Sequence, residues 1–267
     1  EGSVPYHERG WPTCERAWAM LAKPNLRRCW PMLYDAGAPS GEASREPPLH
    51  PDRLEAVLGT KRFTSRKTDL PLVLDLYRET AIAVLGGAIE VRYANNQWHG
   101  AAFESMLEVL PLLERCELLG LSGMRCGDDG ACALATALGG AGTWRGGGST
   151  LGSLQHAIVM RNEIGDRGFA ALADAVAGGC CPQLRTLNLA ANVATEEGKQ
   201  QIERACAARG IRAEFDVSAA RKAEHSTHNR AAHTKEDANR TEVEEDANDG
   251  ASTIVDVIAD KDQWPSL

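Results

Sequence analysis

The chain has 267 residues, 43% of them hydrophobic and 25% charged, which is enough to bury the core of one or two domains. Its formal net charge of −8 argues against a binder of nucleic-acid phosphates, because such a protein needs a basic face. No apolar run approaches the roughly 18 residues of a membrane span, and the segment Glu1-Gly2-Ser3-Val4-Pro5 has none of the features of a signal peptide.

Residues 1–87 are predicted to be mostly helical. Helical patterns begin at Trp11 and at Pro51, and a longer helix is predicted over residues 69–85, with Pro71 in its first turn. Because this last helix directly precedes a set of repeats, we expect it to cover their open end, as repeat arrays require.

A short run near the N-terminus has the spacing of a known catalytic segment. Tyr6, Trp11 and Glu15 read Y-x-x-x-x-W-x-x-x-E, which resembles TIR domains, and Arg9, Trp11 and Glu15 also resemble heterokaryon-incompatibility domains. The resemblance implies a NAD-cleaving site with Glu15 as its catalytic residue. Pro12 departs from the pattern, and the upstream half of such a domain is not in this sequence. Two interpretations stay open: an ordinary packed helix, which we favour, and the relic of a signalling domain.

Residues 88–215 contain a repeated pattern. The segment Leu184–Asn192 reads L-x-x-L-x-L-x-x-N, and the pattern recurs three times upstream. In the four units, the final position of the pattern is occupied by Asn96, Met124, Asn162 and Asn192, at intervals of 28, 38 and 30 residues. Apolar residues follow at offsets that share one face of a helix. Each unit is therefore predicted to contain a short strand, a turn and a helix, and repeats near this period form solenoids.

The third unit continues from Asn162 as N-x-I-G-D-x-G-x-x-A-L-A, which resembles leucine-rich repeats of the ribonuclease-inhibitor class, also found in NOD-like receptors. The resemblance covers roughly residues 88–215 and implies a right-handed α/β solenoid with parallel strands inside and helices outside. An Asn side chain suits the turn because its amide can bond the backbone of a bend. Met124 cannot do so, and its turn is predicted to be looser.

Three further segments complete the organisation. Residues 139–153 are Gly-rich and lack the Lys of a phosphate-binding loop, so they are predicted to be a flexible insertion. Residues 211–215 are predicted to form a final strand, whose outward Arg212 and Glu214 would discourage edge pairing. Residues 216–267 are polar and acidic and are predicted to be disordered.

The cysteines and histidines do not predict a cofactor or a metal site. Cys116, Cys126 and Cys206 occupy core positions of the repeats, where a thiol acts as a small hydrophobic side chain. This favours buried, unpaired thiols and a cytoplasmic location. His225 and His228 have no further ligands arranged around them.

The outward strand positions predict the functional site. They combine an apolar centre with polar flanks, as protein-binding surfaces do, and are Arg92, Asn95, Leu118, His156, Ile158, Met160, Arg161 and Asn188. We expect a non-catalytic module that binds a protein partner on its concave face, with no nucleic-acid, membrane or small-molecule partner. The alternative is a fragment of a TIR-like NAD-cleaving protein.

Overall fold

The computed structural model describes residues 4–21, 46–93, 96, 98–139 and 151–216, which all belong to one compact unit, Glu1–Ala220. Two predicted segments lie outside the described residues and stay predictions. These are most of the Gly-rich insertion, residues 140–150, and nearly all of the C-terminal tail, residues 217–267.

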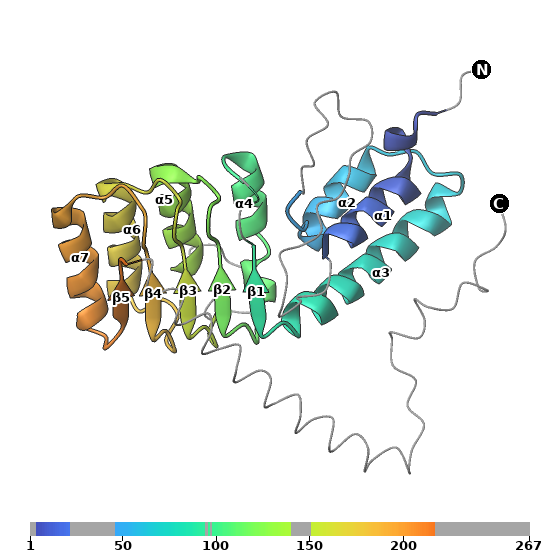
Figure 1. Ribbon diagram of the computed structural model, residues 1–267. Coiled ribbons are helices and arrows are strands. Elements are labelled where there is room, and N and C mark those ends of the chain that lie inside the picture. The colour runs from blue at the N-terminus through green and yellow to red at the C-terminus, as the bar shows by residue number, and fades with distance from the viewer. Residues whose placement is uncertain (1–3, 22–45, 94–95, 97, 140–150, 217–267) are drawn as a thin grey trace, which may run out of the picture. The chain divides into compact units, whose positions relative to one another are not determined.

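A parallel sheet of five strands lies at the centre of the fold, and its strands follow one another in chain order (Figure 1). The strands are β1 (Glu90–Arg92), β2 (Leu118–Gly120), β3 (His156–Ile158), β4 (Thr186–Asn188) and β5 (Arg212–Glu214). All five lie where the sequence predicts a strand. Glu90 pairs in register with Leu118, Leu118 with His156, and the alignment continues through Thr186 to Arg212. Equivalent positions of successive units therefore form rows across the sheet.

A helix follows each of the first four strands, and these helices lie side by side along one face of the sheet (Figure 1). They are α4 (Ala101–Leu107), α5 (Gly127–Leu138), α6 (Asp166–Ala177) and α7 (Glu196–Ala207). The predicted inward residues Phe103, Leu134 and Phe169 are buried. The predicted helix in the first unit is too long: α4 ends at Leu107, and residues Leu110–Leu112 form a 3-10 turn, η2. Pro111 explains this, because proline has no N–H to donate and disfavours helical geometry in the residue before it.

The described parts of the N-terminal region, residues 4–21 and 46–87, are mostly helical, as predicted. A 3-10 turn, η1 (Tyr6–Glu8), precedes α1 (Gly10–Leu21), and α2 (Pro51–Gly59) and α3 (Arg66–Gly86) follow. Helix α3 begins three residues earlier than expected, which places Pro71 beyond its first turn. The backbone bond from Asp69 N to the Ser65 carbonyl, at 2.8 Å, starts the helix there, and the Asp69 carboxylate accepts from Ser65 N at 3.3 Å.

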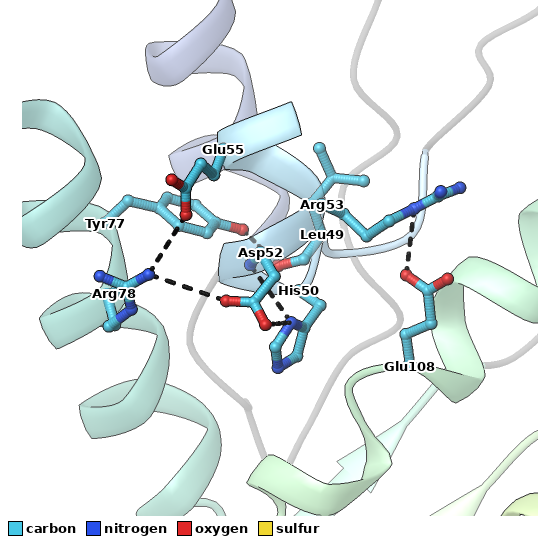
Figure 2. Close-up of polar contacts among 8 residues, drawn as sticks. All are labelled: Leu49, His50, Asp52, Arg53, Glu55, Tyr77, Arg78 and Glu108. Atoms are coloured by element: carbon cyan, nitrogen blue, oxygen red, sulfur yellow. Dashed lines mark hydrogen bonds and ion pairs between the residues drawn. The ribbon is translucent and has the colours of Figure 1, made fainter. Parts of the chain in front are cut away.

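Polar contacts join α2 to α3 (Figure 2). His50 caps the start of α2, where its Nδ1 accepts a hydrogen bond from Asp52 N at 3.3 Å. The Tyr77 hydroxyl of α3 donates to the Leu49 carbonyl at 2.6 Å, and Arg78 lies 3.7 Å from the Asp52 carboxylate. These bonds hold the start of α2 against the middle of α3.

One hydrophobic core runs from Cys14 in α1 to Ile211 before β5. Leu85 at the end of α3 is buried in the same core as Val91 of β1, and Arg53 of α2 pairs with Glu108 after α4 at 3.2 Å (Figure 2). The N-terminal helices therefore share their core with the first strand–helix unit. Among the described helices, none is long and apolar enough to cross a bilayer.

Candidate functional site

The sheet has one face turned away from helices α4 to α7, which we call the helix-free face. Val91, Leu119, Ala157 and Leu187 are buried in the main core, and alternate residues of a strand point to opposite faces. The helix-free face therefore carries Glu90, Arg92, Leu118, Gly120, His156, Ile158, Thr186, Asn188, Arg212 and Glu214 from the strands, with Met160 and Ala190 just beyond them.

The centre of the helix-free face is an apolar cluster of its own. Leu118, Ile158, Met160 and Ala190 group together apart from the main core, with exposed fractions of 6%, 7%, 7% and 0%. The sequence predicts that the first three are exposed contact residues, and this prediction of their exposure is wrong. Neighbouring strands lie about 4.8 Å apart, so side chains in adjacent rows cover each other's flanks.

At the β1 end, Arg92 is half-buried and forms an ion pair with Glu90 of the same strand. A Cβ at Gly120 would lie 3.4 Å from Arg92 Cγ, so the Arg92 side chain rests beside the gap that this glycine leaves. The predicted site residue Asn95 lies outside the described residues.

At the β5 end, two predicted surface residues are buried in a polar contact. Asn188 is 3% exposed: its Nδ2 donates to Glu214 at 3.1 Å, and its Oδ1 accepts from Ala190 N at 3.1 Å. Glu214 is 8% exposed and also pairs with Arg212 at 2.9 Å. Asn188 is therefore already bonded within the chain, and Glu214 is not the outward charge that the sequence predicts. The reason is that register aligns Asn188 with Glu214 on adjacent strands.

His156 lies half-buried in the middle of the helix-free face. Its Nδ1 is 2.8 Å from the Thr186 hydroxyl on the next strand. Burial lowers the pKa of His156, and the positive charges of Arg185 and Arg212 lower it further, against the opposing effect of Glu117 and Glu214. The imidazole is therefore neutral at pH 7 and can serve as a hydrogen-bonding group.

Arg161 follows the apolar cluster and is exposed, as predicted. Its backbone has a φ of 56°, in the left-handed region, and its N–H donates to the Ala190 carbonyl at 3.0 Å. This turn directs a cationic side chain out beside Met160. Arg161 thus places an accessible charge next to the apolar cluster.

The turns beyond the strands are held by asparagines, but not as the sequence predicts. Asn162 Oδ1 accepts from Met124 N at 2.7 Å, and its Nδ2 donates to the Leu121 carbonyl at 2.6 Å. Asn192 bonds the turn of Asn162 in the same way, at 2.9 Å from Asn162 N. Both asparagines therefore support the turn of the preceding unit, and Asn192 also bonds its own turn, where its Nδ2 donates to the Leu189 carbonyl at 2.9 Å. The Met124 turn is bonded by Asn162 rather than loose.

The run that resembles TIR domains lies on the surface of α1. Glu15 is exposed and accepts a hydrogen bond from the Tyr6 hydroxyl at 3.4 Å, and Trp11 Nε1 donates to Asp69 of α3 at 3.3 Å. Tyr6 and Glu15 thus connect η1 to α1, and Trp11 connects α1 to α3. Within the described residues, no group of three or more His, Cys, Asp or Glu side chains is placed to hold a metal ion.

Sequence reasoning did not single out a cavity beneath the strands. The cavity measures about 20 Å³ and lies among side chains of the second, third and fourth units, and its walls are apolar side chains together with Cys180 and Cys181. The sequence contains the adjacent cysteines, but only the fold reveals that they line this space.

In comparisons with known proteins, no protein-family model matches the chain and no curated protein is detectably similar to it.

Proposed function

We propose that residues 88–215 form a leucine-rich-repeat solenoid of the ribonuclease-inhibitor class and that its helix-free, concave face binds a partner protein. The observation that carries this proposal is the register of the five strands. It gathers one residue from each unit into rows, so that a continuous surface is built from many short segments. Rigid extended surfaces of this kind are what repeat proteins use for binding.

The chemistry of the face supports a protein as the partner. An apolar centre is flanked by Arg92 and Arg161, with His156 and Thr186 half-buried beside it. Protein interfaces combine a desolvated centre with a polar rim, and Arg is enriched in them. Leu118, Ile158 and Met160 form the floor of this surface, and the accessible groups at its rim make the polar contacts.

Arg161 is the residue to test, because it is exposed and its replacement leaves the apolar cluster in place. The full-length chain is immobilised, proteins that it retains from an extract of its source cells are identified by mass spectrometry, and the dissociation constant of the purified partner is then measured. Arg161→Glu is expected to weaken binding at least tenfold, which corresponds to about 1.4 kcal/mol.

Arg204→Glu is the matched control, because it makes the same charge change on the exposed side of α7. It is expected to bind the partner as the unmodified chain does. If Arg161→Glu binds as tightly as the unmodified chain, the helix-free face is not the binding surface.

We propose no catalytic role for Glu15. Its carboxylate is exposed and bonded to Tyr6, whereas catalytic groups work in sites that exclude water. The alternative, a fragment of a NAD-cleaving signalling protein, predicts nicotinamide release from NAD by the chain and its loss in Glu15→Gln. We expect that neither the unmodified chain nor Glu15→Gln releases nicotinamide.

We also propose that the protein works in the cytoplasm. The seven cysteines within the described residues are all unpaired, and six of them are buried. Reducing compartments keep thiols in this state, whereas secreted proteins commonly oxidise theirs.

A further inference from the structure

Two adjacent cysteines lie in a strained loop before β4. Cys180 and Cys181 are 6% and 1% exposed, and Cys181 has a φ of 46° although it is not a glycine. This left-handed conformation is costly for a residue with a Cβ, and the next residue, Pro182, further restricts the residue before it to extended geometry. Strained backbone of this kind persists only where the surroundings hold it.

The side chain of Arg209, in the turn after α7, stabilises this conformation of the loop. Its guanidinium donates to the Val176 carbonyl at 2.8 Å, to the Cys180 carbonyl at 2.7 Å and to the Cys181 carbonyl at 3.4 Å. One side chain of the last unit therefore fixes the carbonyls of both cysteines. The same three bonds connect the turn after α7 to this loop and to the end of α6.

The two thiols differ from the other buried thiols of the chain. Burial raises the pKa of Cys14 and Cys116 to about 12, and that of Cys126 and Cys206 to about 11, which makes these thiols unreactive. A hydrogen bond from the Cys181 thiol lowers the pKa of Cys180 despite its burial, and the charge of Arg209 acts in the same direction. The same hydrogen bond raises the pKa of Cys181.

Both cysteines also line the cavity among the second, third and fourth units. Its volume of about 20 Å³ is large enough for a molecule the size of water. The cavity therefore leaves space for a molecule of about this size next to the two cysteines.

We propose that Cys180 and Cys181 form an oxidation site, at which hydrogen peroxide converts the adjacent dithiol into a disulfide. The Cys180 thiolate attacks one peroxide oxygen, the O–O bond breaks, and the departing hydroxide takes the proton of Cys181 to become water. The Cys181 thiolate then attacks the sulfenic acid on Cys180, and the second oxygen leaves as hydroxide, which takes up the proton that Cys180 released when it became a thiolate and forms a second water. Two thiols lose two electrons and two protons, and peroxide is reduced to two waters. This site is independent of the helix-free face.

Disulfide formation must change the loop. Adjacent Cα atoms are about 3.8 Å apart, whereas disulfide-linked residues are usually roughly 4.4 to 6.8 Å apart. The ring that closes is therefore strained and easily reduced again. Closing it rotates the peptide between the two cysteines, and the bond from Arg209 to the Cys180 carbonyl, which belongs to that peptide, is lost. Oxidation thus weakens the connection between the loop before β4 and the turn after α7.

Mass spectrometry of the full-length chain tests the site directly. Trypsin cuts after Arg167 and Arg185, so peptide 168–185 contains both thiols and no other cysteine. After peroxide treatment and alkylation of free thiols, we expect this peptide to be unalkylated and lighter by two hydrogen atoms. Dithiothreitol should restore both alkylation sites.

A stability measurement tests the consequence. Peroxide is expected to lower the melting temperature of the unmodified chain reversibly, and hydrogen exchange should become faster in α7. Cys132→Ser, which removes a half-buried thiol of α5 outside the loop, should respond as the unmodified chain does. Cys181→Ser cannot close the ring and should form no disulfide within peptide 168–185.

Two results would overturn the proposal. In the first, peptide 168–185 keeps both alkylation sites under peroxide that oxidises Cys132. In the second, the disulfide found joins Cys180 or Cys181 to Cys116 or Cys206. Because both readouts come from the unmodified chain, a folding defect in Cys181→Ser would not affect them.

Discussion

Single asparagine side chains connect one turn of the repeat region to the next. Asn192 Oδ1 accepts from Asn162 N at 2.9 Å and Ile164 N at 3.2 Å, and its Nδ2 donates to the Val159 and Leu189 carbonyls at 3.0 and 2.9 Å. An aliphatic residue here would leave these backbone groups without partners. The asparagine pattern could be found in the sequence, but which turn each amide supports depends on the stacking of the units.

Asn192→Ala is expected to lower the free energy of unfolding by about 2–4 kcal/mol, because backbone groups that are shielded from water lose their partners. Urea denaturation monitored by circular dichroism measures the change. Asn192→Asp retains the acceptor oxygen and loses the two donated bonds, so it should fall between the unmodified chain and Asn192→Ala. Equal stability of all three proteins would contradict this role.

His50 makes stability depend on pH. Burial lowers its pKa from 6.5, and Arg78 acts in the same direction against Asp52. The folded chain therefore binds fewer protons than the unfolded chain between the lowered pKa and about 6.5. The contribution of neutral His50 to the free energy of unfolding is complete above this pH range and is lost as the pH falls through it. Protonation also removes the Nδ1 acceptor that caps α2.

His50→Asn keeps a capping side chain without this titration. We expect the free energy of unfolding of the unmodified chain to fall as the pH drops below about 6.5, and to fall less in His50→Asn. His7→Asn on the exposed η1 turn is the control, and urea titrations at several pH values provide the measurement. Identical slopes in all three proteins would show that His50 is not the source. His156, whose pKa is also lowered, contributes a remaining slope in every variant.

At the level of elements, aspartates in the first turn of one helix hold the start of the next. Asp128 of α5 accepts from Gly165 N at 2.7 Å and Gly168 N at 3.0 Å, and Asp166 of α6 accepts from Thr195 N at 2.7 Å. The helix N-termini gain acceptors for N–H groups that would otherwise lack them. The Gly-Asp-x-Gly spacing was visible in the sequence, but the hydrogen bonds of its aspartates cross between units.

Gly168 permits this contact because a Cβ there would lie 2.8 Å from both Asp128 Oδ1 and Ala131 Cβ and would overlap Ile164. Gly168→Ala is therefore expected to lower the free energy of unfolding by about 1–3 kcal/mol through overpacking. Gly59→Ala in α2 meets nothing within 4 Å and serves as the control, with a change below about 1 kcal/mol. Thermal and urea denaturation compare the two. A Gly168→Ala protein as stable as the control would contradict the close approach of α5 and α6.

At the scale of the whole molecule, one core joins the N-terminal helices to the strand–helix units. Such continuity predicts a single cooperative unfolding transition. Trp11 and Trp18 contact the core from α1, so their fluorescence reports on the N-terminal helices in a variant whose other four tryptophans are replaced by phenylalanine, whereas far-ultraviolet circular dichroism reports on all helices.

We expect the urea midpoints from fluorescence and circular dichroism to coincide. Ile202→Ala, which removes a buried side chain of α7, should lower both midpoints together, since such truncations cost about 2–5 kcal/mol. Separate midpoints, or a shift confined to circular dichroism, would mean that the two regions unfold independently.

The sequence by itself determined the positions of the five strands and of most helices, because apolar periodicity and turn residues are local signals. It also indicated that Cys116, Cys126 and Cys206 belong to the core. The tertiary structure decided which side chains remain accessible. Leu118, Ile158, Met160 and Asn188 were expected at the surface and are buried, because exposure depends on neighbours from other strands. Only the fold placed Arg209 on the carbonyls of two cysteines and each asparagine on the preceding turn, since these contacts join residues about 30 positions apart in the chain.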